Sequence, residues 1–400
     1  MNARSCPPTW CPISEPKQTS RTAIVLCHIA LFPCTQGNRV VVRQLLGQLR
    51  AAKCRVILVM PTPRASIEPF LEAYRDVCDE LHVVEPGLKW GAKHARPTLC
   101  AADRGTGHLD AVLEHLCTDP AVQMCIAQYV HLASSLAVVP DHVRTAVMTH
   151  DVLHRLADQK VNLPAFRQCT AEQEAMLLRH ADVLIAINAA ERSILKTLIP
   201  DRKVIEVGLA VESPRRSAVP GDTPPTILFT GSGNPMNVDG VSRFLTEAWP
   251  QVHAAVPDSR LLIAGGVCEM LEDDSAPSGV TMLGIVDDLD ACYDRAHVVI
   301  NCTIMGTGLK IKCIEALGCG KALVTTANGA EGLPGQPGRD YIVTETIADM
   351  AATLIELLNT PDRVASLARA AFSCATNELE PAKVYQPLLE ALSSPAQQVK

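Results

Sequence analysis

Residues 22–60 decide the fold and read TAIVLCHIALFPCTQGNRVVVRQLLGQLRAAKCRVILVM. The opening run, TAIVLCHIAL, is apolar almost throughout and predicts a buried strand. A loop with Pro33 and Gly37 follows, and residues 39–53 then show the spacing of an amphipathic helix. The run RVILVM at 55–60 predicts a second strand. Strands without polar alternation, joined by a helix, indicate a parallel sheet that helices cover on both faces.

The same strand and helix pattern continues along the chain and then starts afresh after a break. The break, SPRRSAVPGDTPP at residues 213–225, is dense in Pro, Gly and Ser and predicts an interdomain linker. After it, TILFTG at 226–231 opens a second series of strands and helices. We therefore expect an α/β protein with two doubly wound, Rossmann-like domains that face each other across a cleft. One large sheet is the alternative.

The expected domain boundaries follow from the same pattern. Residues 1–20 are rich in Pro and Ser, lack an apolar core and are expected to be a disordered tail. The first domain is expected over residues 21–212 and the second over residues 226–375. Residues 376–400 are expected to form a C-terminal helix or tail.

Composition limits the classes of function. The chain has 400 residues, which suits two domains with a core each, and only 4% of them are aromatic. So few aromatics argue against a base-stacking surface and a nucleic-acid partner. The 16 cysteines form no C-x-x-C pair, and Cys27, Cys302 and Cys313 lie in apolar runs. We expect reduced core cysteines in a cytoplasmic protein, since no secretory leader and no membrane-length apolar run is present.

Residues 306–315, GTGLKIKCIE, are the strongest candidate for a binding site. They follow an apolar strand run, begin with Gly306 and Gly308, and lead into a helix pattern. Such glycines let backbone N–H groups approach a phosphate, and a helix N-terminus adds partial positive charge. Gly308, Lys312 and Glu315 share one helix face by their spacing. A cation for phosphate and a carboxylate for ribose hydroxyls suit a nucleoside diphosphate; an exposed Lys–Glu ion pair is the alternative.

The run MGTGLKIKCIEALGCGKALVTTANGAEGL at 305–333 resembles the donor-binding segment of family 4 glycosyltransferases, which have the two-domain GT-B fold. The resemblance continues in FTGSGNPMNVDGVSRFLTEAWPQVHAAVPDSRLLIAGG at 229–266 and in GIVDDLDACYDRAHVVI at 284–300. It also reaches the first domain at residues 32–59 and at the pair His150-Asp151. It covers most of the chain between residues 22 and 375 and points to enzymes of bacterial polysaccharide or glycan biosynthesis.

The resemblance implies roles for individual residues. Glu315 matches the second Glu of the family's E-x₇-E pattern and would hold the donor ribose, whereas Thr307 stands where the first Glu is expected. The loop GSGNPMN lacks the Arg and Lys that many members carry, which moves diphosphate binding to Lys310 and Lys312. The implied donor-binding set is Gly37, Gly306, Thr307, Gly308, Lys310, Lys312 and Glu315, and the implied catalytic set is His150, Lys312 and Glu315.

The resemblance further implies a hexosyltransferase-like enzyme that moves a sugar from a nucleoside-diphosphate sugar to a glycan or lipid-linked acceptor. Retention of configuration is implied, with no metal and no cofactor besides the co-substrate. The D-x-D of Asp288 and Asp290 begins a helix pattern and is interpreted as a cap, not a metal site. A GT-B nucleotide-sugar epimerase is one alternative. A non-catalytic nucleotide-binding relative is the other, and Thr307 favours it.

The predicted helix at 39–53 leaves a second question open. It carries Arg39, Arg43, Arg50 and Lys53 without an acidic residue. Such a helix could contact an anionic membrane, which would make the protein peripheral at the inner membrane face, or a lipid-linked phosphate. The alternative is a helix packed on its own sheet with arginines extended to solvent.

Overall fold

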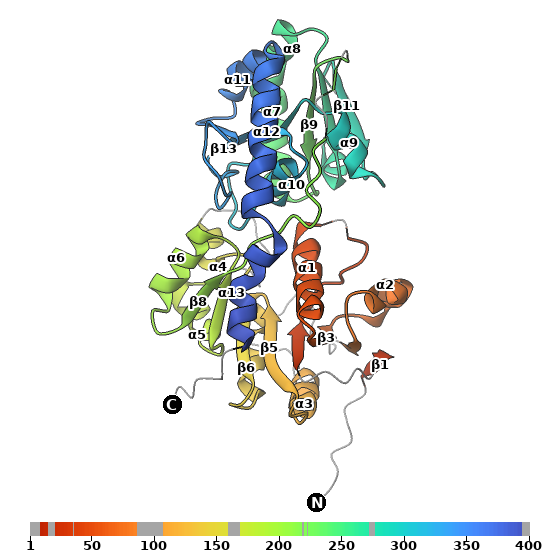
Figure 1. Cartoon of the computed structure of the whole chain (residues 1–400), viewed down its shortest axis with the longest axis vertical. Helices are drawn as coiled ribbons and strands as arrows, with labels where there is room; N and C mark the ends of the chain where they lie inside the picture. The colour runs from red at the N-terminus through yellow and green to blue at the C-terminus, as the bar shows by residue number, and fades with distance from the viewer. Residues whose placement is uncertain are drawn as a thin grey trace, which may run out of the picture. The chain divides into compact units, whose positions relative to one another are not determined.

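The computed structural model describes residues 9–14, 21–34, 36–85, 107–158, 169–217, 220–221, 223–271 and 277–393. The chain forms two compact units, and Figure 1 labels many of their helices and strands. Unit 1 comprises residues 1–208 and 385–400, and unit 2 comprises residues 209–384. Each unit is an α/β structure with a sheet of its own, as expected. The alternative of one large sheet is wrong.

Unit 1 is built on an eight-stranded sheet with the order β1-β4-β3-β2-β5-β6-β7-β8. Its strands are β1 (Trp10–Ser14), β2 (Thr22–Leu26), β3 (Arg55–Pro61), β4 (Glu80–Val84), β5 (Val122–Gln128), β6 (Arg144–Met148), β7 (Val183–Ala186) and β8 (Lys203–Glu206). Its helices include α1 (Gly37–Ala51), α2 (Leu71–Arg75), α3 (Gly107–Leu116), α4 (Leu153–Asp158), α5 (Ala171–Leu178) and α6 (Ala189–Leu198). All neighbouring strands are parallel except β1 and β4. The order reverses between β2 and β5, so their carboxyl ends form the switch point of this sheet.

Burial on both faces explains why these strands are apolar throughout. In β2, Ile24 and Leu26 belong to one core cluster of unit 1. Ala23 and Val25 point to the opposite face and are fully buried as well. A strand covered on both sides has no reason to alternate apolar and polar residues.

Unit 2 is built on a six-stranded parallel sheet with the order β11-β10-β9-β12-β13-β14. Its strands are β9 (Thr226–Thr230), β10 (Arg260–Ala264), β11 (Val280–Gly284), β12 (Val298–Asn301), β13 (Ala322–Thr326) and β14 (Ile342–Thr344). Its helices are α7 (Pro235–Glu247), α8 (Trp249–Ala255), α9 (Leu289–Arg295), α10 (Ile311–Gly318), α11 (Met350–Leu358), α12 (Pro361–Glu378) and the start of α13 (Pro381–Ser393). The order reverses between β9 and β12, which is the Rossmann arrangement.

The expected linker is part of unit 2. Arg215 forms an ion pair with Asp294 at 2.6 Å, and the backbone N–H of Arg215 donates to the carbonyl of Gly318 at 2.8 Å. Ser217 is buried and also donates to Asp294. The two units therefore divide between residues 208 and 209, not at residues 213–225. The Pro and Gly content marked an irregular segment correctly, but side-chain bonds hold it on the second sheet's helices.

The expected N-terminal tail contains a strand, and the expected C-terminal helix or tail contains a helix. Within residues 1–20, Trp10–Ser14 form β1, with Ile13 1% exposed. Pro12 is tolerated because β1 is an edge strand. At the other end, residues 376–393 complete α12 and form α13, and its residues from Tyr385 onward belong to unit 1. Of the helices in the described residues, none is long and apolar enough to cross a membrane.

Candidate functional site

The candidate site of unit 2 lies at its switch point. Strands β9 and β12 pair in parallel, so the loops that follow them leave the same edge of the sheet. The loop after β9 leads into α7, and the loop after β12 leads into α10. Ligands of doubly wound sheets bind where two such loops diverge. The segment that includes Gly306, Lys312 and Glu315 therefore lies where the fold itself favours a ligand.

The glycine loop before α10 has the backbone conformation that requires glycine. Gly306 has φ 105° and Gly308 has φ 79°, both outside the range that L side chains adopt readily. Thr307 lies between them, at the position where the resemblance expects a carboxylate. The side-chain amide of Asn328 donates to the carbonyl of Gly306 at 2.9 Å and helps to fix the loop.

The helix begins later than its sequence pattern predicts. Lys310 is the N-cap of α10 and Ile311 its first residue, so Gly308 lies before the helix and does not share its face. The glycines account for this shift, because their positive φ values are incompatible with a right-handed helix. The amine of Lys310 folds back and donates to the carbonyl of Gly308 at 3.0 Å. The N-terminus of α10 has no acidic residue in its first turn.

Lys312 is the half-buried cation of the site. Its Nζ donates to Asn237 Oδ1 at 2.7 Å and lies 4.3 Å from the ring centroid of Phe229. Burial lowers the pKa of Lys312 to about 8. Asn237 belongs to α7 and donates to the carbonyl of Ser232 at 2.9 Å. Lys312 is therefore linked through Asn237 to the loop that follows β9, although that loop carries no cation of its own.

Glu315 lies one turn further along α10. Its Oε2 accepts from the hydroxyl of Tyr293, on α9, at 3.1 Å. Burial raises the pKa of Glu315, while the Tyr293 hydrogen bond and the charge of Lys312 act in the opposite direction. Lys312 and Glu315 thus bond to neighbouring helices and not to each other. The exposed Lys–Glu ion pair, the alternative from the sequence, is wrong.

His150 lies in unit 1, two residues beyond β6. Its φ is 61°, an uncommon value for a residue with a side chain, and such values concentrate at functional sites. The side chain is 6% exposed, with Nε2 2.8 Å from Gln128 Oε1 and the ring stacked on Tyr129 at 4.2 Å. Gln128 ends β5 and Tyr129 follows it, which places His150 beside the switch point of the first sheet.

Gly37 and the cations of α1 also belong to unit 1. Gly37 is the first residue of α1, and that helix has no acidic residue in its first turn. All three arginines of α1 have partners within the chain. Arg39 donates to the carbonyl of Pro33, Arg43 lies 5.1 Å from the ring of Phe32, and Arg50 pairs with Asp79 at 3.5 Å. These contacts agree with the interpretation of α1 as a helix packed on its own sheet.

The remaining expectations from the sequence can be placed directly. Asp288 caps α9, since its side chain accepts from the N–H of Ala291 at 3.1 Å, and Asp290 pairs with Arg215 at 3.3 Å. The capping interpretation of this D-x-D is confirmed. Asn237 and Tyr293 were not predicted as site residues, because only the folded sheet brings them beside Lys312 and Glu315.

Part of the chain matches a known protein family. Residues 224–360 match the family described as glycosyl transferases group 1. A curated relative, an uncharacterized 44.6 kDa protein in the cps region of Klebsiella pneumoniae, is 25% identical over 174 residues. That alignment covers 41% of this chain and 45% of the relative, so it spans less than half of the relative's length.

Solved structures of similar fold cover nearly the whole chain. Sucrose-phosphate synthase from Thermosynechococcus elongatus matches 93% of this chain and 98% of its own, with a TM-score of 0.68 and 14% identity. Anabaena HepE, solved with UDP and glucose, matches 94% and 100%, with a TM-score of 0.67 and 15% identity. An S. aureus TarM variant, solved with fondaparinux, alpha-GlcNAc-glycerol and UDP, matches 94% and 100%, with a TM-score of 0.71 and 9% identity.

The chain has the fold of the GT-B glycosyltransferases. Residues 224–360, the span that matches the group 1 glycosyl transferase family, contain β9, β12 and α10. The fold class and the family resemblance expected from the sequence are thereby confirmed.

Proposed function

We propose that the chain transfers a sugar from a nucleoside-diphosphate sugar to a glycan or lipid-linked acceptor. The observation that carries this proposal is the arrangement at the switch point of unit 2. There a glycine loop, the ammonium of Lys312 and the carboxylate of Glu315 all lie in residues 306–315, the segment that follows β12. Lys312 and the N-terminus of α10 would hold the diphosphate, and Glu315 would accept hydrogen bonds from the ribose hydroxyls.

This arrangement also supports a mechanism. Cleavage of the bond between sugar and diphosphate places negative charge on the departing phosphate, and a cation in a half-buried site stabilises that charge more strongly than it could in water. Lys310 and Lys312 supply such charge without a metal. We propose that the departing phosphate accepts the proton of the acceptor hydroxyl on the same face, which retains the configuration. His150 would contact the donor sugar.

The comparisons guide the choice of donor and acceptor. Anabaena HepE and S. aureus TarM were both solved with UDP, so UDP-sugars are the first donors to test. The curated relative comes from a cps region, which favours a polysaccharide or its lipid-linked precursor as acceptor.

The test is a transfer assay with defined components. The full chain is incubated with UDP-sugars and with lipid-linked or oligosaccharide acceptors, and the anomeric configuration of the product is read by NMR. We expect UDP release only with acceptor, and a product that keeps the donor's configuration. If the sugar of the donor is epimerised when no acceptor is present, the chain is a nucleotide-sugar epimerase. A trapped covalent sugar–protein adduct would contradict the same-face mechanism.

A non-catalytic nucleotide-binding protein is the second candidate, and Thr307 favours it. A threonine in place of a carboxylate removes the charge that would hold the donor sugar's hydroxyls. Such a protein would bind UDP-sugars through Lys312 and Glu315 yet release no UDP with any acceptor. The variant Thr307→Glu separates the two: in an enzyme it changes the KM of a reaction that wild type already performs, whereas in a protein that is inactive because of Thr307 turnover appears only in the variant.

A further inference from the structure

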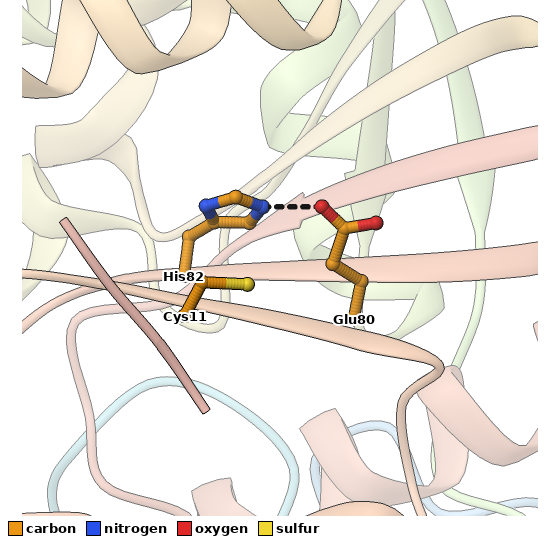
Figure 2. A group of neighbouring side chains, drawn as sticks. All are labelled: Cys11, Glu80 and His82. Atoms are coloured by element: carbon orange, nitrogen blue, oxygen red, sulfur yellow. Dashed lines mark hydrogen bonds and ion pairs between the residues drawn. The ribbon is translucent and has the colours of Figure 1, made fainter. Parts of the chain in front are cut away.

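Three side chains suited to binding a cation converge at one edge of the unit 1 sheet, away from its switch point. Cys11 lies on β1, and Glu80 and His82 lie on the adjacent strand β4. One ligand atom of each lies within 4.8 Å of the other two. Figure 2 shows the His82 ring and the Glu80 carboxylate facing each other, with the Cys11 sulfur beside them. His82 Nε2 and Glu80 Oε1 are 2.5 Å apart.

The strands explain why these residues meet. Glu80 and His82 are two residues apart on β4, so their side chains point to the same face of the sheet. On β1, Trp10 pairs with Val83 but Ile13 pairs with Leu81, so β1 contains one more residue than β4 over this span. Such a bulge turns a side chain out of the regular alternation, and Cys11 lies within it.

Glu80 is held from its other side. Its Oε2 bonds to Arg55, and Arg55 also pairs with Asp119 at 3.6 Å. One carboxylate oxygen is thus occupied, and the other faces His82. Hydrogen bonds of this kind fix the orientation of ligating carboxylates in metal sites.

We propose that Cys11, Glu80 and His82 bind one Zn²⁺ ion, with a water molecule as fourth ligand. Thiolate, imidazole and carboxylate are the ligands that zinc takes, whereas Ca²⁺ and Mg²⁺ take oxygen. Ligand atoms about 2.0–2.3 Å from a tetrahedral zinc ion lie roughly 3.3–3.6 Å from one another, which small side-chain rotations achieve here. When the ion binds, the thiol releases its proton to solvent, and the His82 ring carries its proton on Nδ1, so that Nε2 and Glu80 Oε1 bind the ion in place of their hydrogen bond to each other.

The ion would fasten β1 to the sheet. β1 is short and pairs with β4 alone. Two of its side chains hold it to unit 1: Ile13 is buried, and the ring centroid of Trp10 lies 4.2 Å from the guanidinium of Arg64. A bond from each strand to one ion adds a cross-link between them. Cys11 is exposed, which gives the ion a route into the site.

Cobalt spectroscopy on the full chain tests this site directly. After removal of metal with EDTA and dialysis, Co²⁺ is titrated under reducing conditions. We expect a thiolate-to-cobalt charge-transfer band that saturates at one equivalent. Cys11→Ser should abolish the band, and Cys268→Ser, at another partly exposed cysteine, should leave it unchanged.

Zinc affinity and stability give the second readout. In competition with a chromogenic chelator, His82→Gln should weaken Zn²⁺ binding at least about tenfold, while the exposed His142→Gln should not. Zn²⁺ should raise the thermal midpoint of wild type and of both controls but not of Cys11→Ser. If wild type and Cys11→Ser have equal thermal midpoints in EDTA, the Cys11→Ser variant is folded. If Cys11→Ser does not fold, Cys11→Ala replaces it in both experiments. A wild-type chain without the band, or a band that survives in Cys11→Ser, overturns the proposal.

Discussion

Lys312 is the residue on which the proposed donor site depends most. Its amine is half-buried, is held by Asn237 at 2.7 Å and faces the ring of Phe229. Burial lowers its pKa to about 8, because water no longer solvates the ammonium fully. A phosphate oxygen would replace that lost solvation, so diphosphate binding and protonation of Lys312 should favour each other.

Affinity for nucleoside diphosphate should therefore depend on pH. Below a pH of about 8 Lys312 is cationic, and above it the charge is lost, so affinity should fall as the pH rises through this value. Lys312→Met should bind nucleoside diphosphate roughly 10–100-fold more weakly at neutral pH, because it loses a charged hydrogen bond of about 1.5–3 kcal/mol. Its affinity should not fall as the pH rises through about 8. Calorimetric titration across this range measures both. A pH-independent wild-type affinity would contradict this role of Lys312.

Tyr293 should position Glu315 and keep it ionised. Its hydroxyl lowers the pKa of the carboxyl group, whereas burial raises it. In Tyr293→Phe the Glu315 pKa should rise further, so the loss of donor affinity on acidification should begin at a higher pH than in wild type. Dissociation constants measured as a function of pH test this shift. Tyr341→Phe, at another buried tyrosine of unit 2, is the control. If donor affinity in Tyr293→Phe falls at the same acidic pH as in wild type, Tyr293 does not keep Glu315 ionised.

At the scale of elements, the site depends on how closely α7 approaches β12. A Cβ atom on Gly240 of α7 would lie 2.6 Å from the carbonyl oxygen of Cys302, so only glycine permits this contact. The same helix carries Asn237, the partner of Lys312. The distance between α7 and the sheet is thereby coupled to the position of the cation.

Gly240→Ala should push α7 away from the sheet. We expect a loss of about 1–3 kcal/mol in the free energy of unfolding, together with weaker donor binding because Asn237 moves. Gly47→Ala on α1 is the matched control, since no atom lies within 4 Å of its added Cβ. It should stabilise the chain by about 0.5–1 kcal/mol. Chemical denaturation of both variants measures the change in the free energy of unfolding, and donor titration measures the change in affinity. Unchanged donor binding in Gly240→Ala would show that the position of α7 does not affect the site.

The local sequence pattern predicted which segments form helices and strands better than it predicted where those elements begin and end. The buried strands were recognisable because apolar runs such as β9 and β12 are covered on both faces. Helices α7 and α8 follow each other with one residue between them, since Pro250 cannot continue the hydrogen-bond ladder of α7. β1 was missed because it is short, contains Pro12 and gains its stability from pairing with β4, seventy residues away. Long-range pairing leaves little trace in a local pattern.

The candidate site was predictable to the extent that it lies on one segment. Gly306, Lys312 and Glu315 are close in sequence, and their order identifies a phosphate-seeking loop and helix. Their partners Asn237 and Tyr293 come from other helices, so only the sheet order brings them together. Cys11, in the expected tail, was overlooked for the same reason.

At the scale of the whole molecule, the chain returns to unit 1 at its end. α13 begins at Pro381 in unit 2, and its residues from Tyr385 onward belong to unit 1. Tyr385 and Leu388 are fully buried, and Arg144 donates to the carbonyl of Ala391. The C-terminal segment, expected to be a helix or a tail, is therefore a helix whose residues from Tyr385 onward are part of unit 1.

Leu388→Ala should destabilise unit 1 without changing the donor site. We expect a loss of about 2–5 kcal/mol in the free energy of unfolding, the usual cost of removing a buried leucine side chain. Donor affinity should stay the same, because Lys312 and Glu315 belong to unit 2. Denaturant unfolding and donor titration of one preparation measure both quantities. A stability close to wild type would show that residues after Tyr385 contribute little to unit 1.

Thermal unfolding with UDP-, GDP-, ADP- and TDP-sugars tests the central claim, donor binding at α10, most directly. A ligand at a hundred times its dissociation constant stabilises the native state by about 2.7 kcal/mol. We predict that sugars of one nucleoside diphosphate raise the midpoint of wild type and of Lys196→Met, an exposed lysine on α6, to the same extent, and raise that of Lys312→Met much less. Stabilisation by none of the nucleotide sugars, or an equal rise in Lys312→Met, would contradict the claim.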